Sequence, residues 1–171
     1  MSRRIVRIKA QDVSCRKSSQ YSEHETQGVL GIDPVMLGAG NGNSQIRSPL
    51  DVNGNLCEAM GSNIFLVCDG SLMTPREQFV LPGISRAMVM ELAAELDIPC
   101  KEVDVDPFDA INADEIFLTS TSLCICGVRS FNGAAIGVGT VPGPITQRLI
   151  NAYAKSVGCD YVGQYMARLD G

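Results

Sequence analysis

The sequence contains a single histidine and no tryptophan, and its seven cysteines include no CxxC pair. A structural zinc site normally draws on paired cysteines and on histidine, so we expect no metal site. A disulfide framework would use an even, patterned set of cysteines, whereas these are scattered. The cysteines therefore indicate small buried hydrophobes in a reducing compartment, and His24, between two glutamates, is expected to be solvated.

Clustered cations and long apolar runs are also missing. The formal net charge is −5, whereas nucleic acids and anionic membrane surfaces select basic patches. No stretch is long enough to span a bilayer, and the basic residues 1–4 do not lead into the apolar run of a signal peptide. We therefore expect a cytoplasmic protein with no nucleic-acid partner and no membrane partner.

The hydrophobic pattern predicts a mixture of strands and helices. Asn53-Gly54 and Asp69-Gly70 each lie between apolar runs, which is the strongest short signal for a β-hairpin. Apolar residues recur at helical spacing over residues 84–96 and again over residues 145–157. The 171 residues suffice for one compact domain. The pattern thus predicts a single mixed α/β domain over residues 1–171, with a mostly antiparallel sheet and packed helices.

Two further segments bear on how the chain is organised. Residues 3–10 alternate between charged and apolar side chains, which is typical of a half-buried strand. Residues 31–48 are rich in Gly, Asn and Ser, and this composition predicts a flexible loop.

The step Pro82-Gly83 stands directly before the first of the two predicted helices. The free N–H groups and the dipole of a helix start attract anions, and Gly83 has no side chain to block a phosphate. A second cluster of small hydroxyls, TSTS at residues 119–122, closes a predicted strand. Together the two clusters favour a phosphate-binding site. Taken alone, the first could be an ordinary capped helix start and the second a polar strand end. Because GxGxxG and GxxxxGK[ST] are both absent, a nucleotide-binding fold is not indicated.

Several longer stretches resemble one known family. They are CEAMGSNIFLVCDGSLMTP, LPGISRAMVMELAAELDIP, ADEIFLTSTSLCICGVRSFNG and IGVGTVPGPITQRLINAYAKSVG. In this order they resemble the pyridoxal-phosphate enzymes of aminotransferase class IV (fold type IV), which include branched-chain and D-amino-acid aminotransferases and aminodeoxychorismate lyase. The resemblance covers about residues 50–161. It implies the larger, C-terminal lobe of a D-amino-acid aminotransferase-like enzyme, in which the cofactor lies between two lobes.

The resemblance also implies which residues meet the reactive end of the cofactor. Lys17 in CRKSSQY matches the lysine that binds the cofactor covalently, and Tyr21 matches the tyrosine four residues later. Glu58 matches the glutamate that contacts the pyridine nitrogen, where a carboxylate keeps that nitrogen protonated. Lys9 is the nearest rival for the role of Lys17, and both Lys17 and Glu58 could equally be solvated surface residues.

Other matched positions would hold the rest of the cofactor and the substrate. Leu81 matches the leucine that packs on the cofactor ring. Ile84 and Ser85 match the pair whose backbone N–H groups hold the phosphate. Thr121 matches a further phosphate ligand, and Ser122 matches a position that helps to hold the substrate carboxylate.

The implied activity is the pyridoxal 5'-phosphate-dependent transfer of amino groups between amino acids and 2-oxo acids, of the branched-chain or D-amino-acid type. Two alternatives stay open because only one lobe is matched. One is a lyase of the same family that eliminates pyruvate, and the other is a truncated remnant without catalysis. The cleft face that the first lobe would cover is expected to favour self-association, so we expect a homo-oligomer, most simply a dimer.

Overall fold

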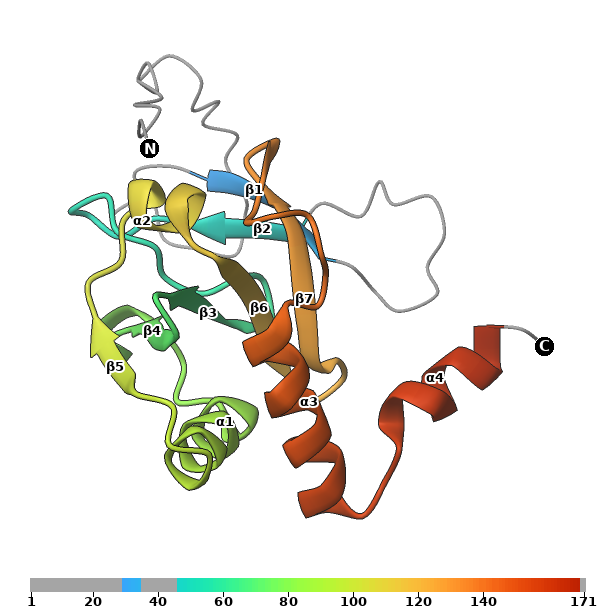
Figure 1. Cartoon of the computed structure of the whole chain (residues 1–171). Coiled ribbons are helices and arrows are strands. Elements are labelled where there is room, and N and C mark those ends of the chain that lie inside the picture. Colours follow the sequence, from blue (N-terminus) through green and yellow to red (C-terminus); the bar gives the residue numbers. More distant parts are fainter. Residues whose placement is uncertain (1–28, 35–45, 170–171) are drawn as a thin grey trace.

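A computed structural model describes residues 29–34 and 46–169 (Figure 1). The predicted strand at residues 3–10 lies outside the described residues. The loop predicted at residues 31–48 is wrong at both of its ends, because these residues belong to strands. These are β1 (Val29–Pro34) and β2 (Ile46–Pro49), which pair antiparallel with Ile32 opposite Ile46. The middle of that loop, residues 35–45, is outside the described residues, so there the loop stays a prediction.

The described strands form one sheet in the order β2-β1-β7-β6-β3-β4-β5, with β8 pairing beside β7. Neighbouring strands are antiparallel except for β4 and β5, which are parallel and are joined through a helix. This arrangement confirms the predicted mixed α/β fold with a mostly antiparallel sheet. The remaining strands are β3 (Asn63–Cys68), β4 (Ser71–Pro75), β5 (Cys100–Val103), β6 (Glu115–Ser120), β7 (Cys124–Phe131) and β8 (Ala134–Ala135).

Helices cover both faces of this sheet. The two predicted helices are α1 (Ile84–Glu95) and α3 (Pro144–Val157), and they pack together on one face (Figure 1). The short helix α2 (Pro107–Asn112) packs on the opposite face. A 3-10 turn, η2 (Glu77–Phe79), precedes α1, and α4 (Tyr161–Leu169) follows α3 without having been predicted. None of the helices in the described ranges is long and apolar enough to cross a membrane.

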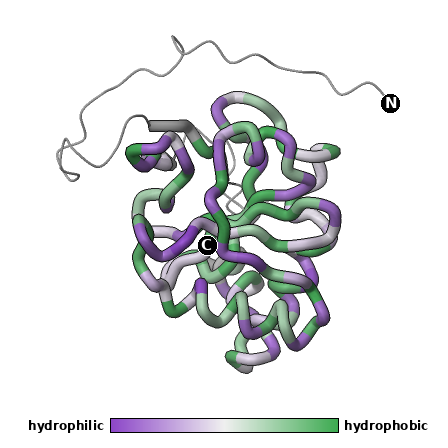
Figure 2. The backbone as a smooth tube through the Cα atoms, turned by 90° about the vertical axis from the view of Figure 1, so that its left-hand side faces the viewer, coloured by the Kyte–Doolittle hydropathy of each residue, from purple (hydrophilic) through white to green (hydrophobic). Residues whose placement is uncertain are grey.

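The central strands β3 and β6 are buried on both faces. Phe65 and Phe117 point toward α1 and α3, and their rings stack with centroids 5.0 Å apart. Ile64 and Leu66 point to the other face and join the core under α2. Since successive side chains of a strand alternate between faces, two-sided burial requires a continuous apolar run. Figure 2 shows such hydrophobic stretches crossing the middle of the domain.

The two predicted hairpins have different outcomes. Asp69 and Gly70 adopt positive φ of 49° and 76° and connect β3 to β4, so this hairpin is confirmed. At Asn53-Gly54 the hairpin prediction is wrong in extent, because only one isolated bridge joins Leu50 to Leu56. The reason is local. An oxygen of the Asp51 carboxylate accepts the N–H groups of Asn53 and Asn55 at 2.8 Å each, in place of a strand partner.

Candidate functional site

An open pocket of about 160 Å³ lies at the start of α1, where three segments of the chain meet. Its walls come from residues within 58–63 before and at the start of β3, from residues within 81–85, and from residues 119–121 at the end of β6. The first and third segments are neighbours because β3 and β6 run antiparallel with Asn63 opposite Thr119. We call this feature the α1 pocket.

The start of α1 is open to an anion. Gly83 is the N-cap residue, and because glycine has no side chain it provides no side-chain cap for the helix. A helix start leaves several backbone N–H groups without partners inside the helix, and a side-chain cap normally takes up one of them. Ser85 is buried in the first turn and Ile84 is 78% exposed. The first turn of α1 therefore presents N–H groups to the α1 pocket.

The other long helix shows what a closed start looks like. At α3, the buried carboxylate of Glu115 accepts the backbone N–H of Ile145 at 2.9 Å and that of Thr146 at 2.8 Å. The N-cap residue Gly143 lies so close that an added Cβ would collide with Glu115. In α3 a negative group of the protein itself thus occupies the position that is left open in α1.

Asn63 fixes the segment that leads into α1. Its Nδ2 donates to the carbonyl oxygen of Leu81 at 3.0 Å, and the Gly83 N–H donates to the same oxygen at 2.8 Å. A Cβ added at Gly83 would collide with Asn63 Oδ1. Glycine at position 83 therefore allows the turn before α1 to press against the start of β3. Sequence analysis did not single out Asn63, although it stands inside the CEAMGSN motif.

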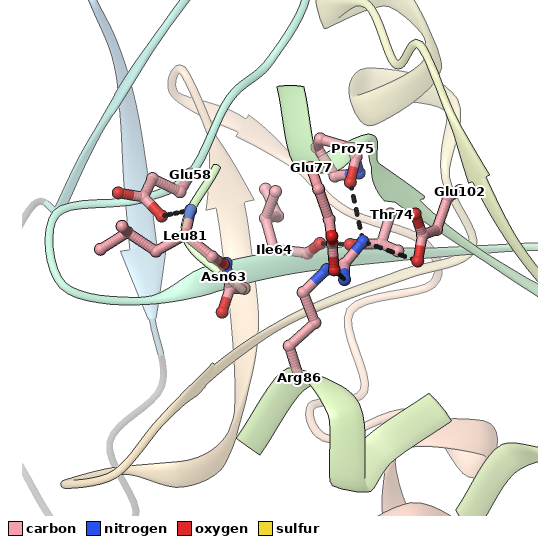
Figure 3. Close-up of polar contacts among 9 residues, drawn as sticks. All are labelled: Glu58, Asn63, Ile64, Thr74, Pro75, Glu77, Leu81, Arg86 and Glu102. Atoms are coloured by element: carbon pink, nitrogen blue, oxygen red, sulfur yellow. Dashed lines mark hydrogen bonds and ion pairs between the residues drawn. The ribbon is translucent and has the colours of Figure 1, made fainter. Parts of the chain in front are cut away.

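Glu58 also lines the α1 pocket, and Figure 3 shows its carboxylate beside the backbone of Leu81. Its Oε2 accepts the backbone N–H of Leu81 at 2.9 Å, which holds the carboxylate beside that residue. A carboxylate can accept several hydrogen bonds, so this contact leaves capacity for a ligand. The Leu81 side chain is 69% exposed at the same place. The pocket thus combines an acceptor, an exposed apolar side chain and the donors of the helix start.

The TSTS cluster contributes the third wall. Thr119, Ser120 and Thr121 line the pocket, and Thr121 was the one predicted to bind phosphate. Ser122 does not line the pocket, but its hydroxyl is 3.2 Å from that of Ser120, which also accepts the N–H of Leu123 at 3.0 Å. Thr119 and Ser120 were noticed only as members of the cluster, because the sequence does not tell which of four small hydroxyls face a cavity.

Arg86 anchors the first turn of α1 to the sheet. Only 2% of the residue is exposed, and Figure 3 shows it reaching from α1 toward three acceptors. Its Nη1 is 3.1 Å from Glu77 Oε1, and its Nη2 is 3.2 Å from Glu102 Oε1 and 3.1 Å from the Pro75 carbonyl oxygen. Arg86 thereby ties the helix start to β4, η2 and β5, and it was missed by sequence analysis.

The pocket brings together five of the eight predicted site residues. A sixth, Ser122, does not line it, but its hydroxyl is within hydrogen-bond distance of the hydroxyl of the pocket residue Ser120. The five are Glu58, Leu81, Ile84, Ser85 and Thr121. Lys17 and Tyr21 lie outside the described residues, so their roles stay predictions.

The thiol of Cys57, the neighbour of Glu58 in the sequence, is buried. Burial together with the charges of Asp51 and Glu58 raises the pKa of the Cys57 thiol to about 12. Cys57 is therefore a neutral core residue at physiological pH and not a nucleophile.

We expect Gly83→Ala to destabilise the protein by about 1–2 kcal/mol, because the new Cβ must displace the Asn63 amide from its contact with Leu81. The same displacement should weaken phosphate binding at the start of α1. Urea unfolding and phosphate titration measure the two effects. The double variant Asn63→Ala, Gly83→Ala removes the clash and should cost less than the sum of the single variants. Additive costs would contradict this account of the contact.

Comparison with known proteins gives a consistent match over the segments that build the pocket. The model of the family described as amino-transferase class IV matches residues 43–131. The branched-chain-amino-acid aminotransferase of Escherichia coli K12 is 41% identical over 105 residues, which cover 61% of this chain and 34% of that protein. The probable branched-chain-amino-acid aminotransferase of Thermotoga maritima is 40% identical over 109 residues, covering 63% of this chain and 40% of that protein.

Solved structures match in the same way. The branched-chain amino acid aminotransferase from Thermobaculum terrenum, crystallised in its PLP-form (holo-form), superposes with a TM-score of 0.63 at 34% sequence identity. The match covers 70% of this chain and 39% of that one. The chain thus spans about a third of the length of the first curated relatives that it matches.

Proposed function

Since this chain belongs to the amino-transferase class IV family, we propose that it forms the cofactor-binding part of a pyridoxal-phosphate-dependent aminotransferase. The observation that carries the proposal is the α1 pocket, which is lined by the first residues of a helix, by the carboxylate of Glu58 and by an exposed leucine. The proposed substrates are an amino acid and a 2-oxo acid of the branched-chain type, as the names of the relatives suggest.

The pocket suits a group with a phosphate at one end and a protonated ring nitrogen at the other. The start of α1 offers N–H donors for the phosphate, and Thr121 adds a hydroxyl. The Thr119 hydroxyl is buried without a partner in the described part of the chain, which is expected where a ligand supplies the missing contact. Glu58 offers an acceptor for an N–H group. The residues present therefore fit pyridoxal phosphate.

Each residue of the site would then have one task. When bound, pyridoxal phosphate would supply an electron sink for the carbon next to the amino group. The N–H groups of Ile84 and Ser85 hold the phosphate and so fix the position of the ring. Glu58 keeps the ring nitrogen protonated through its negative charge, and Leu81 packs against the ring and excludes water.

Lys17 is the proposed base that moves the proton, and Tyr21 is its proposed neighbour. Ser122 is the proposed contact of the substrate carboxylate, within reach of the hydroxyl network of Ser120. A second copy of the chain is the proposed partner, because Leu81 and Ile84 are exposed beside the pocket and a further surface would cover them.

The proposal is tested by adding pyridoxal phosphate to the purified chain and recording the visible spectrum before and after reduction with borohydride. We expect a chromophore that reduction fixes to Lys17, as located by peptide mapping, and we expect Lys17→Ala to abolish it. Lys101 and Lys155 serve as internal controls because they should remain unlabelled. A flat spectrum would contradict the proposal and favour a non-catalytic remnant. Label on Lys9, Lys101 or Lys155 would show that Lys17 was wrongly assigned.

A further inference from the structure

We propose that the hydroxyl of Thr119 donates a hydrogen bond to the phosphate group bound at the start of α1. This inference rests on the proposed function. It adds a phosphate-binding residue from β6 that is more deeply buried than Thr121 and that the sequence resemblance does not assign. It follows from the face on which Thr119 lies, from its burial and from its lack of a partner.

The strand register places the side chain of Thr119 under the start of α1. Residues directly opposite each other in an antiparallel pair project to the same face, and Asn63 is opposite Thr119. The Asn63 side chain reaches Leu81 and touches Gly83, so this face is the one that carries the start of α1. Phe65 and Phe117 lie two residues along the same strands, and their stacked rings pack into the core beneath α1.

The Thr119 hydroxyl is in a position where a missing partner is costly. Thr119 is 1% exposed, and its Oγ1 is buried with no hydrogen-bond partner among the residues that the structure describes. Leaving a buried hydroxyl unpaired costs about 1–3 kcal/mol, and most buried polar atoms in folded proteins have a partner. Since Thr119 also lines the α1 pocket, an acceptor bound there is the partner that its position provides for.

Thr146 provides a comparison within the same molecule. Its hydroxyl is likewise buried without a partner in the described ranges. Its backbone N–H, however, is bonded to Glu115 at the closed start of α3, and it does not line the α1 pocket. Removing the hydroxyl from either threonine should affect folding similarly, whereas removal at position 119 alone should affect phosphate binding.

The test compares Thr119→Val, Thr119→Ser and Thr146→Val with the parent chain. Each protein is titrated with inorganic phosphate and with pyridoxal phosphate by calorimetry, and thermal unfolding is recorded without ligand. Because hydrogen bonds to charged groups are worth about 1.5–3 kcal/mol, we expect Thr119→Val to bind both ligands at least about tenfold more weakly. Thr119→Ser and Thr146→Val should bind like the parent. Without ligand, Thr119→Val should be at least as stable as the parent, since valine removes an unpaired hydroxyl.

The outcomes separate this inference from the proposed function. If Thr119→Val binds pyridoxal phosphate as tightly as the parent does, the role of Thr119 is overturned and the proposed function stands. If the parent binds inorganic phosphate in a Thr119-dependent way but does not bind pyridoxal phosphate, the role of Thr119 stands and the proposed function is overturned. A parent that binds neither ligand overturns both. Should Thr119→Val not fold, Thr119→Ala compared with Thr119→Ser gives the same decision, because only serine keeps the donor.

Discussion

Replacing Arg86 with alanine is expected to lower the free energy of unfolding by about 3 kcal/mol. The guanidinium is buried and joins Glu77, Glu102 and the Pro75 carbonyl oxygen. Removing it leaves the buried carbonyl oxygen without a donor and leaves two carboxylates near each other without a cation. Urea denaturation measures the effect. Arg86→Lys should lower the free energy of unfolding by less than Arg86→Ala, because lysine keeps the positive charge.

Arg76→Ala is the matched control for this experiment. Arg76 pairs with Asp104 at 3.1 Å, but both side chains are largely exposed. Exposed ion pairs contribute between zero and about 1 kcal/mol, so Arg76→Ala should unfold nearly like the parent. Equal losses for the two alanine variants would mean that Arg86 is not the anchor of α1.

Under the proposed function, we expect Glu58→Gln to leave the binding of pyridoxal phosphate nearly unchanged but to lower the rate of amino-group transfer on the order of 100-fold. Glutamine can still accept the Leu81 N–H through its amide oxygen, so the local structure should be retained. What it lacks is the negative charge that keeps a ring nitrogen protonated. Single-turnover kinetics with an amino acid, followed through the visible spectrum, would measure the rate.

Glu91→Gln provides the control, because Glu91 is an exposed glutamate on α1 that does not line the pocket. It should react at the rate of the parent. A Glu58→Gln variant that reacts as fast as Glu91→Gln would remove Glu58 from the mechanism. A variant that no longer binds the cofactor would instead give Glu58 a role in holding the pocket together.

The features that sequence predicted well are those set by neighbouring residues. The helical spacing of Val89, Leu92 and Ala93 predicted the buried face of α1, and all three are buried. Asp69-Gly70 predicted a turn because few other pairs adopt two consecutive positive φ angles at low cost. The resemblance to the family also named Glu58 and the residues at the start of α1, which line one pocket, while their roles toward a cofactor stay predictions.

The features that sequence did not predict depend on contacts between distant segments. Glu115 closes the start of α3 from 30 residues away, and Asn63 holds a carbonyl 18 residues further along. The register of β6 against β3 places Thr119 opposite Asn63, and this position is what the TSTS sequence alone does not reveal. The parallel pairing of β5 with β4 likewise follows from the path of the chain through α1. No local pattern specifies a register or a path through space.

Because β3 and β6 are buried on both faces, their backbone should open much more rarely than the exposed segments around them. The backbone of a strand that is covered on both sides opens only in events that approach global unfolding, whereas exposed turns open locally and often. The α1 pocket takes one wall from the ends of these strands and another from the segment around Leu81, which is largely exposed. The strand residues Asn63 and Thr119 should therefore keep their positions for the lifetime of the folded state, while the segment around Leu81 can move locally around a bound ligand.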